Sequence, residues 1–286
     1  MKRSSAYVPG LILASSTMLA ISCTKTDIAA ESPEVTNKKK TDCEVTAFRS
    51  GTSQYIFKKQ IDPATGKVQQ INAAVYQGGG ISKTISLDVH WNSGSVAFIK
   101  SGTTTDTVLV ASLNADGKPV NVVAGNTPDA NYLPTSFEYQ SNRLSAMKIS
   151  LAGNVNVSRF NYDDRNNCTL IQDEARAGEI PGRVEYSYSN RRADKQVYLD
   201  EPRPYSWNTF SLMQFSGMFT ELQPANLRTA VKVWWGNNYK AYDAELINHD
   251  VSGGTLVKYD VAFPGSTVSL PQSIETQCDA ALANNN

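Results

Sequence analysis

Hydrophobic and polar positions alternate with a period of two along most of the chain after residue 42. In segment 257–263, Val, Tyr, Val and Phe alternate with Lys, Asp and Ala, and segment 230–235 alternates in the same way up to two adjacent tryptophans. A β-strand with one buried face requires this pattern, because successive side chains point to opposite faces of a sheet. The alternation therefore predicts a β-rich domain, which we assign to residues 43–286.

Short polar segments separate these runs. They hold Asp, Asn, Gly and Pro in combinations that reverse a chain tightly, and they occur at residues 62–67, 114–118, 152–154, 163–167 and 252–254. Connections this short join neighbouring strands in antiparallel order. We therefore expect a mainly β fold in which about a dozen strands form a single large antiparallel meander sheet, curled and packed on one short buried helix.

One segment follows a helical period instead. From Ser206 to Leu222, aromatic and aliphatic residues recur three or four positions apart, after a Ser suited to cap a helix and before Pro224. Because the segment is apolar nearly all round, it predicts a helix buried against the sheet. Its Glu221, Gln214 and hydroxyl residues favour this core helix over insertion into a membrane.

Residues 1–22 have the three parts of an export signal. Lys2 and Arg3 precede an apolar stretch, and the box Leu19-Ala20-Ile21-Ser22-Cys23 follows. The stretch is too interrupted to remain in a bilayer as a spanning helix. It resembles a bacterial lipoprotein signal, which implies cleavage between Ser22 and Cys23 and acylation of the Cys23 sulfur. An ordinary cleaved secretory signal with an incidental Cys is the alternative.

Residues 23–42 separate the signal from the β-rich domain. They hold no aromatic residue and carry the lysine run 38–40 with several acids, which leaves too little apolar surface to offset the entropy of ordering. We therefore expect a lipidated Cys23 and a flexible tether, with membrane lipid as the partner of the acyl chains. Thr24 rather than Asp follows Cys23, which by resemblance to enterobacterial sorting favours the outer membrane of the bacterial cell envelope. Which leaflet faces the protein stays open.

The charge balance excludes one class of partner. The 286-residue chain contains 27 Lys and Arg against 27 Asp and Glu, with two His. A dedicated nucleic-acid-binding protein carries a basic excess that neutralises phosphates. No nucleic-acid partner is therefore expected.

Three segments share a pattern that indicates a repeated hairpin. Phe137-Glu138-Tyr139, Phe160-Asn161-Tyr162 and Val184-Glu185-Tyr186 each precede an Asn-containing turn, and their tyrosines are 23 and 24 residues apart. One repeat is therefore one hairpin, which must stack on its neighbours to bury its face.

These hairpins resemble the tyrosine-aspartate repeats of Bacteroidota cell-surface lipoproteins of unknown function. In those proteins a strand that begins at a Cys follows the tether, tyrosine-rich hairpins come next, and an apolar helical segment leads into final strands that end near a Cys. Cys43, the hairpins, segment 206–222 and Cys278 occur here in that order, and Tyr162-Asp163 and Tyr259-Asp260 keep the Tyr-Asp pair. The resemblance extends over nearly the whole chain after Cys23 and supplies no catalytic residues.

Three cysteines remain beside the lipidated one, namely Cys43, Cys168 and Cys278. An oxidising compartment favours disulfides, and an odd number leaves one thiol unpaired. A disulfide between Cys43 and Cys278 would join the first strand to the last and stabilise the fold by about 4 to 5 kcal/mol in the chain-entropy model. The other pairings stay open. No C-x-x-C spacing occurs, so no metal site is expected.

The sequence holds no recognisable catalytic constellation. His90 and His249 lack the spaced companions of a metal-ligand set, and the adjacent Asp163 and Asp164 fit a turn better than a general acid and base. No nucleotide-binding, calcium-binding or nucleophile-elbow spacing occurs. We therefore expect neither a cofactor nor an enzymatic activity.

Two features favour recognition or modification. Trp234 and Trp235 are adjacent on an expected strand, so they face opposite sides, and one exposed ring is suited to stack on a sugar. Packing in the core or at its rim is the alternative. Asp106-Thr107-Val108 resembles the Asp-Ser/Thr-aliphatic acceptor of Bacteroidota O-glycosylation, which implies a glycan on Thr107.

Three hypotheses follow from these features. The first is a lipid-anchored, non-enzymatic envelope protein that acts as a binding or structural module, with a glycan or an envelope protein as its partner. The second is a glycan-binding accessory lipoprotein that uses an exposed Trp234 or Trp235. The third, an envelope hydrolase, has no nucleophile, base or metal site in the sequence to support it.

Overall fold

A computed structural model describes residues 43–51, 54–77, 80–151, 153–175, 181–198, 205–236 and 239–278. The predicted signal and tether, residues 1–22 and 23–42, lie outside the described residues. The β-rich domain belongs to one compact unit, Lys40–Asn286. In the described part of the chain, no helix combines the length and apolar character needed to cross a membrane.

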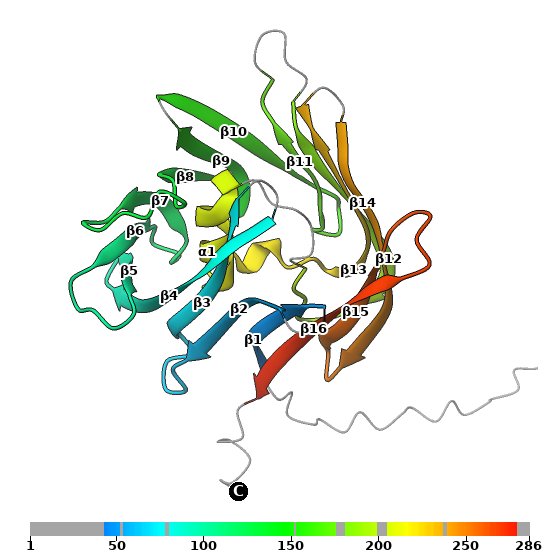
Figure 1. Ribbon diagram of the computed structural model, residues 1–286, viewed down its shortest axis with the longest axis horizontal. Helices are drawn as coiled ribbons and strands as arrows, with labels where there is room; N and C mark the ends of the chain where they lie inside the picture. The colour runs from blue at the N-terminus through cyan, green and yellow to red at the C-terminus, as the bar shows by residue number, and fades with distance from the viewer. Residues whose placement is uncertain are drawn as a thin grey trace, which may run out of the picture. The chain divides into compact units, whose positions relative to one another are not determined.

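Sixteen β-strands form a closed antiparallel barrel (Figure 1). Their bounds are Cys43–Ser50 (β1), Gln54–Ile61 (β2), Val68–Gln77 (β3), Gly80–Asn92 (β4), Ser95–Lys100 (β5), Thr107–Leu113 (β6), Pro119–Ala124 (β7), Thr135–Gln140 (β8), Arg143–Leu151 (β9), Asn154–Tyr162 (β10), Cys168–Asp173 (β11), Arg183–Arg192 (β12), Asn226–Trp235 (β13), Tyr239–Ser252 (β14), Thr255–Ala262 (β15) and Ser269–Cys278 (β16).

Each strand pairs with its neighbours in the sequence, and β1 pairs with β16 to close the ring. The predicted mainly β, antiparallel meander is therefore confirmed. Its extent is not, because the sheet has sixteen strands rather than about a dozen and is closed rather than only curled. Closure removes the two edges that an open meander would leave unpaired.

The barrel has two ends with different connections. At one end, which we call the turn end, β1 begins, β16 ends, and tight reversals at residues 93–94, 141–142 and 253–254 join adjacent strands. Gly94 and Asn142 have φ of 75° and 64° there, the left-handed backbone that two-residue hairpin turns require. At the other end, the loop end, longer connections span residues 101–106, 125–134 and 263–268.

The connection from β12 to β13 enters the barrel. It contains the 3-10 turns Tyr205–Trp207 (η1) and Thr220–Leu222 (η2), with the helix Asn208–Phe215 (α1) between them. Figure 1 shows α1 inside the ring of strands. We call residues 205–224 the plug. Three aromatic pairs join the plug to the wall: Phe215 with Phe57 at 4.8 Å between ring centres, Phe219 with Phe137 at 5.0 Å, and Phe210 with Phe160 at 5.8 Å.

The predicted helix Ser206–Leu222 is shorter in the structure. It ends at Phe215 because Gly217 has φ of 79°, and the amides of Gly217 and Met218 donate back to the carbonyls of Gln214 and Met213. The predicted burial is confirmed, since every residue of α1 except Gln214 is buried. The helix therefore packs inside a closed barrel instead of against one face of an open sheet.

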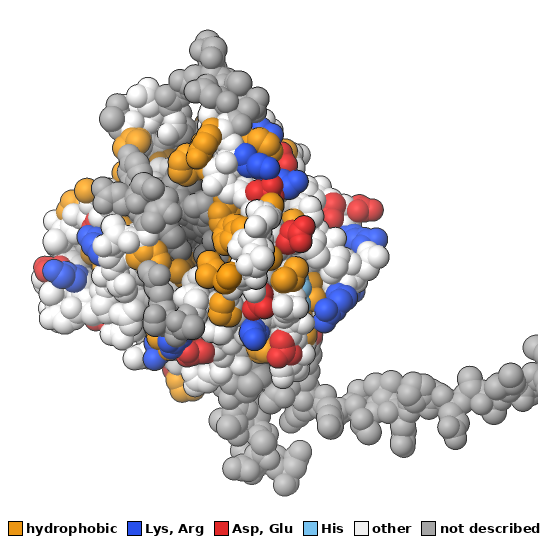
Figure 2. Space-filling model, turned by 45° about the vertical axis from the view of Figure 1, so that its right-hand side comes forward, with side chains coloured by type: hydrophobic (Ala, Val, Ile, Leu, Met, Phe, Trp, Pro, Cys, Tyr) orange, Lys and Arg blue, Asp and Glu red, His pale blue; other side chains and the backbone are white. Residues whose placement is uncertain are grey.

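The two faces of the wall differ sharply in polarity. Buried apolar side chains such as Leu87 and Val89 of β4 face the lumen, whereas the alternate positions 82–90 hold Ser, Thr, Ser, Asp and His. On β12, β13 and β14, Glu185, Lys232 and Asp243 are register partners on the outer face. Figure 2 shows side chains of both charge signs interspersed with apolar ones over the visible face. The outer surface is therefore mixed and charged, while the lumen carries the core.

A recurrent contact joins neighbouring strands at the turn end. Near the end of β4, β8, β10 and β12, an aromatic ring donates a hydrogen bond to a backbone carbonyl at the start of the preceding strand. We call these contacts the aromatic latches: Trp91 Nε1 to Val68 O at 2.8 Å, Tyr139 Oη to Pro119 O at 2.8 Å, Tyr162 Oη to Leu144 O at 2.9 Å, and Tyr188 Oη to Cys168 O at 2.6 Å.

The latches give the sequence repeat a physical meaning. The strand register shifts immediately before each of the three latch tyrosines, and such a bulge re-aims a side chain. Tyr139 and Tyr162 were the expected repeat positions, but the third latch is Tyr188 rather than Tyr186. The first two predicted hairpins are present as β8–β9 and β10–β11, but the third is wrong, because Asn190 lies within β12 and the plug follows that strand. What recurs is an aromatic donor rather than a Tyr-Asp pair.

Candidate functional site

The cysteines predicted from the sequence fall into three groups. The lipidation site, Ser22 and Cys23, lies outside the described residues. Cys43 and Cys278 are backbone register partners across β1 and β16, and their disulfide stays a prediction. Cys168 is a buried free thiol, and burial raises its pKa to about 12. A thiol held protonated in this way is chemically inert near neutral pH.

The two tryptophans have different surroundings. Trp234 is half-buried, with the Arg183 guanidinium carbon 4.5 Å and the Lys240 ammonium 5.7 Å from its ring centre. Trp235 is 41% exposed, and its ring lies 6.1 Å from that of Tyr239, which is 63% exposed. Neither tryptophan belongs to the buried core. Trp235, and not Trp234, therefore offers an open aromatic face at the loop end.

Thr107 begins β6 and is half-buried. Its backbone N–H donates to Asn126 Oδ1 at 2.8 Å, and Gly125 packs so closely that a Cβ there would lie 2.8 Å from Thr107 Cγ2. Thr107 is thus tightly packed at the start of β6. Its O-glycosylation stays a prediction.

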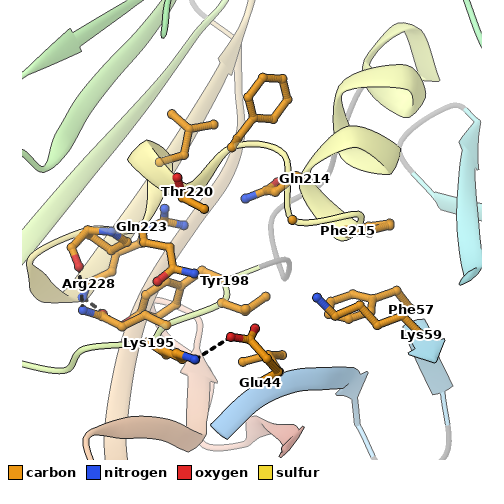
Figure 3. A pocket seen from close by; sticks show the side chains of 17 residues that line it. Glu44, Phe57, Lys59, Lys195, Tyr198, Gln214, Phe215, Thr220, Gln223 and Arg228 are labelled. Carbon is orange, nitrogen blue, oxygen red and sulfur yellow. Dashed lines mark hydrogen bonds and ion pairs between the residues drawn. The ribbon is translucent and has the colours of Figure 1, made fainter. Parts of the chain in front are cut away.

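A pocket of about 240 Å³ lies inside the barrel at the turn end (Figure 3). It is bounded by the starts of β1 and β13, the second half of β2, residues 195–198 and the second half of the plug. Its lining consists of Glu44, Val45, Phe57, Lys59, Lys195, Gln196, Val197, Tyr198, Gln214, Phe215, Gly217, Phe219, Thr220, Leu222, Gln223, Pro224 and Arg228. We call it the turn-end pocket.

Three cations and one carboxylate give this pocket its charge. Lys195 Nζ lies 2.6 Å from Glu44 Oε1, so this pair is mutually neutral. Arg228 is only 8% exposed, and its guanidinium carbon lies 3.9 Å from the ring centre of Tyr186 and 4.6 Å from that of Tyr198. Aromatic faces attract a guanidinium and hold it in place. The lining therefore has a net positive charge.

Lys59 is the cation that points into the open part of the pocket. Its side chain follows Phe57 on the inner face of β2, and Figure 3 shows its amine directed into the cavity. Burial lowers the pKa of Lys59 to about 8, although Glu44 nearby acts in the opposite direction and Lys195 adds to the lowering. Within the described part of the chain, no residue hydrogen-bonds or ion-pairs with its ammonium.

Apolar side chains line the pocket beside Lys59. Phe57 and Phe215 form a stacked pair, and Phe219 and Leu222 of the plug extend this surface. The backbone beside it is fixed by Gln196, whose Nε2 donates to Ala193 O at 3.1 Å and to Pro224 O at 2.8 Å. The pocket is thus preformed, and both charged and apolar side chains line it.

Sequence reasoning missed this site. Its one available signal was Lys59, which is in phase with Phe57 and Ile61 and so occupies a core-facing position of β2. A lysine at such a position is unusual, because core-facing positions of a strand are mostly apolar. The other contributors, Lys195 and Arg228, come from segments far apart in the chain that only the closed barrel brings together.

A second cavity, of about 390 Å³, lies at the loop end beside Trp207. Asp173 lines it and accepts a hydrogen bond from Ser158 Oγ at 2.7 Å, and burial raises the pKa of this carboxyl. The adjacent Glu174 also lines this cavity, and its carboxylate pairs with Arg159. One carboxyl is thus bonded to a hydroxyl and the other is ion-paired.

The remaining titratable residues singled out from the sequence are Asp163, His90 and His249. Burial raises the pKa of Asp163, but hydrogen bonds from the Asn167 side chain and from the backbone amides of Asn167 and Arg165 outweigh it and lower that pKa. These bonds fix the turn predicted there. His90 is exposed, and the ring of His249 stacks on Tyr259 with 6.0 Å between centres. No group of three potential ligands for a metal ion occurs among the residues that the structure describes.

No family model matches the chain, and no curated protein matches it in sequence. Solved structures do resemble it. A porin-like protein from Bacteroides uniformis superposes with a TM-score of 0.56 at 12% identity, covering 82% of this chain and 96% of that one. A porin-like protein from Bacteroides vulgatus gives 0.51 at 11%, covering 82% and 98%. These matches give no support to the expected tyrosine-aspartate repeat. At such low identity the likeness concerns the fold alone: the chain has a porin-like, sixteen-stranded antiparallel barrel.

Proposed function

We propose that this chain is a lipid-anchored, non-enzymatic binding protein of the bacterial outer membrane, whose barrel stands outside the bilayer and does not conduct. The observation that carries the proposal is the plug. Its aromatic residues pack against the inner wall of the barrel, where an aqueous channel would need water and polar side chains.

The charged outer face of the wall favours a barrel that is surrounded by water. A membrane-embedded barrel carries an outward apolar band about 25 Å tall, and charged residues on that face destabilise it. Here Glu185 of β12 pairs in register with Lys232 of β13, and Lys232 pairs with Asp243 of β14. All three residues lie on the outer face. The exposed Lys58 and Lys258 add charge on β2 and β15. A separate acyl anchor at Cys23 would then supply the membrane attachment that the wall does not.

Two measurements on the full-length chain, expressed in a bacterium that acylates lipoproteins, test this proposal. The chain should incorporate an alkyne-labelled palmitate and sediment with membranes, and Cys23→Ala should abolish both. Reconstituted into planar bilayers, it should produce no ion conductance. Stable conductance steps would overturn the binding role of the lumen, and a membrane-bound Cys23→Ala chain that resists carbonate extraction would overturn the anchor.

One observation favours a second function, glycan binding. Trp235 and Tyr239 are exposed neighbours at the loop end, and paired aromatic faces suit stacking on sugar rings. Glycan-array binding that is lost in Trp235→Ala and retained in Trp234→Ala would support it, because the Trp234 ring lies among cations rather than open to solvent. An envelope hydrolase is favoured by no comparable observation.

A further inference from the structure

We propose that the turn-end pocket binds a small organic anion, in which one carboxylate or phosphate group is attached to an apolar body. This proposal rests on the binding role proposed above and names the class of ligand.

The charged side of the pocket has an unmatched cation. Of its charged groups, Glu44 is already paired with Lys195 at 2.6 Å. Arg228 is held by aromatic rings, and Lys59 is the positive charge directed into the cavity. Among the described residues, nothing hydrogen-bonds or ion-pairs with the Lys59 ammonium. An unpaired cation turned into a cavity is costly, and a bound anion removes that cost.

The apolar part of the lining selects an apolar body. Phe57, Phe215 and Leu222 belong to it, so a purely inorganic anion would leave these side chains in contact with water. At about 240 Å³ the pocket lies below the 300–1,000 Å³ that is common for ligand sites, which favours a compact ligand. The exposed Thr220 and Gln223 at its margin offer hydroxyl and amide donors for the remaining acceptor atoms of an anionic head group.

The protonation of Lys59 gives the binding a pH dependence. Because burial lowers the pKa of Lys59 to about 8, the ammonium is charged at pH 7 and loses its proton at moderately alkaline pH. A bound anion favours the charged form. Glu44 and Lys195 are the other charged groups that influence it, and they act in opposite directions. Anion affinity should therefore fall as the pH rises above about 8.

Hexyl phosphate is the probe for the test, and 1-hexanol of equal chain length is its uncharged control. We expect calorimetry at pH 7 to show hexyl phosphate binding at least tenfold more tightly than hexanol. Lys59→Met, which keeps the apolar stem, should weaken hexyl phosphate at least tenfold. The matched control is Lys58→Met, whose side chain is exposed on the outer face of the same strand and should leave the affinity unchanged.

The same variants distinguish a free anion from a lipid head group. Co-sedimentation of the Cys23→Ala chain with phosphatidylglycerol vesicles, sensitive to Lys59→Met, would assign the anion to a lipid. Binding of hexyl phosphate without vesicle binding would assign it to a soluble ligand. Equal affinity for hexanol and hexyl phosphate, no binding of either, or equal losses in Lys58→Met and Lys59→Met would overturn the proposal. A negative result here leaves acylation at Cys23 and the absence of conductance unaffected, so the two proposals fail separately.

Discussion

Cys43 and Cys278 are backbone register partners where the first and last strands of the barrel meet. Register partners on antiparallel strands have Cα atoms about 4.5 to 5.5 Å apart, and a disulfide needs about 4.4 to 6.8 Å. We predict that the oxidised chain carries this disulfide and that Cys43→Ser lowers the free energy of unfolding by about 4 to 5 kcal/mol, the chain-entropy value for so long a loop. Urea unfolding with and without reductant measures the loss, and mass spectrometry of unreduced peptides identifies the bond.

Cys168 provides the control for that prediction. Its thiol is buried and its pKa is raised to about 12, so an alkylating agent added to the folded chain should not label it. Cys168→Ala should keep the disulfide and its dependence on reductant. A cross-linked peptide containing Cys168, or free thiols at both Cys43 and Cys278 after export, would contradict the assignment.

Lys59 predicts an unusual dependence of stability on pH. Its pKa is lowered from 10.5 to about 8 in the folded chain. Between these values the unfolded chain keeps a proton that the folded chain has lost, so the free energy of unfolding rises with pH. We expect a gain of up to about 2 kcal/mol between pH 7.5 and 10, measured by urea unfolding. Lys59→Met should remove this rise and be more stable than the native chain at pH 7, whereas Lys58→Met should keep it.

The aromatic latches make a third prediction. Tyr162→Phe removes the hydroxyl that donates to Leu144 O at 2.9 Å and leaves the ring in place. We expect a loss of about 0.5 to 1.5 kcal/mol in the free energy of unfolding. Tyr239→Phe is the matched control, because that ring is 63% exposed and should change stability by less than about 0.5 kcal/mol. Equal effects of the two substitutions would mean that the latch hydrogen bond contributes nothing.

Local patterns made much of this fold predictable. Alternation such as that of segment 257–263 marks a strand wherever one face is buried, and the apolar period of segment 206–222 marks a helix. Closure was not predictable in this way. It depends on the pairing of β1 with β16, two strands at opposite ends of the domain, and no local pattern reports a contact of that range.

The candidate site shows the same limit more strongly. Lys59, Lys195 and Arg228 lie in three different segments, and each alone looks like an ordinary charged residue of a strand or loop. Only the closed barrel and its plug bring them to one cavity. The adjacent tryptophans correctly indicated two different environments, because successive strand residues point to opposite sides of the sheet. Which ring stays exposed depends on Arg183 and Lys240, which lie beside Trp234.

The plug yields the last prediction. Phe210 is 3% exposed and lies 5.2 Å from Phe219, 5.8 Å from Trp207 and 5.8 Å from Phe160 of the wall, measured between ring centres. If the plug is the core of the barrel, Phe210→Ala leaves a cavity and should cost about 3 to 5 kcal/mol in the free energy of unfolding. Val155→Ala, at a side chain that is 54% exposed, should cost less than about 0.5 kcal/mol. A plug that only rests in a self-supporting barrel would instead give a small loss for Phe210→Ala, together with a separate, earlier transition in the unfolding curve. A single transition shifted to lower urea shows that wall and plug fold as one unit.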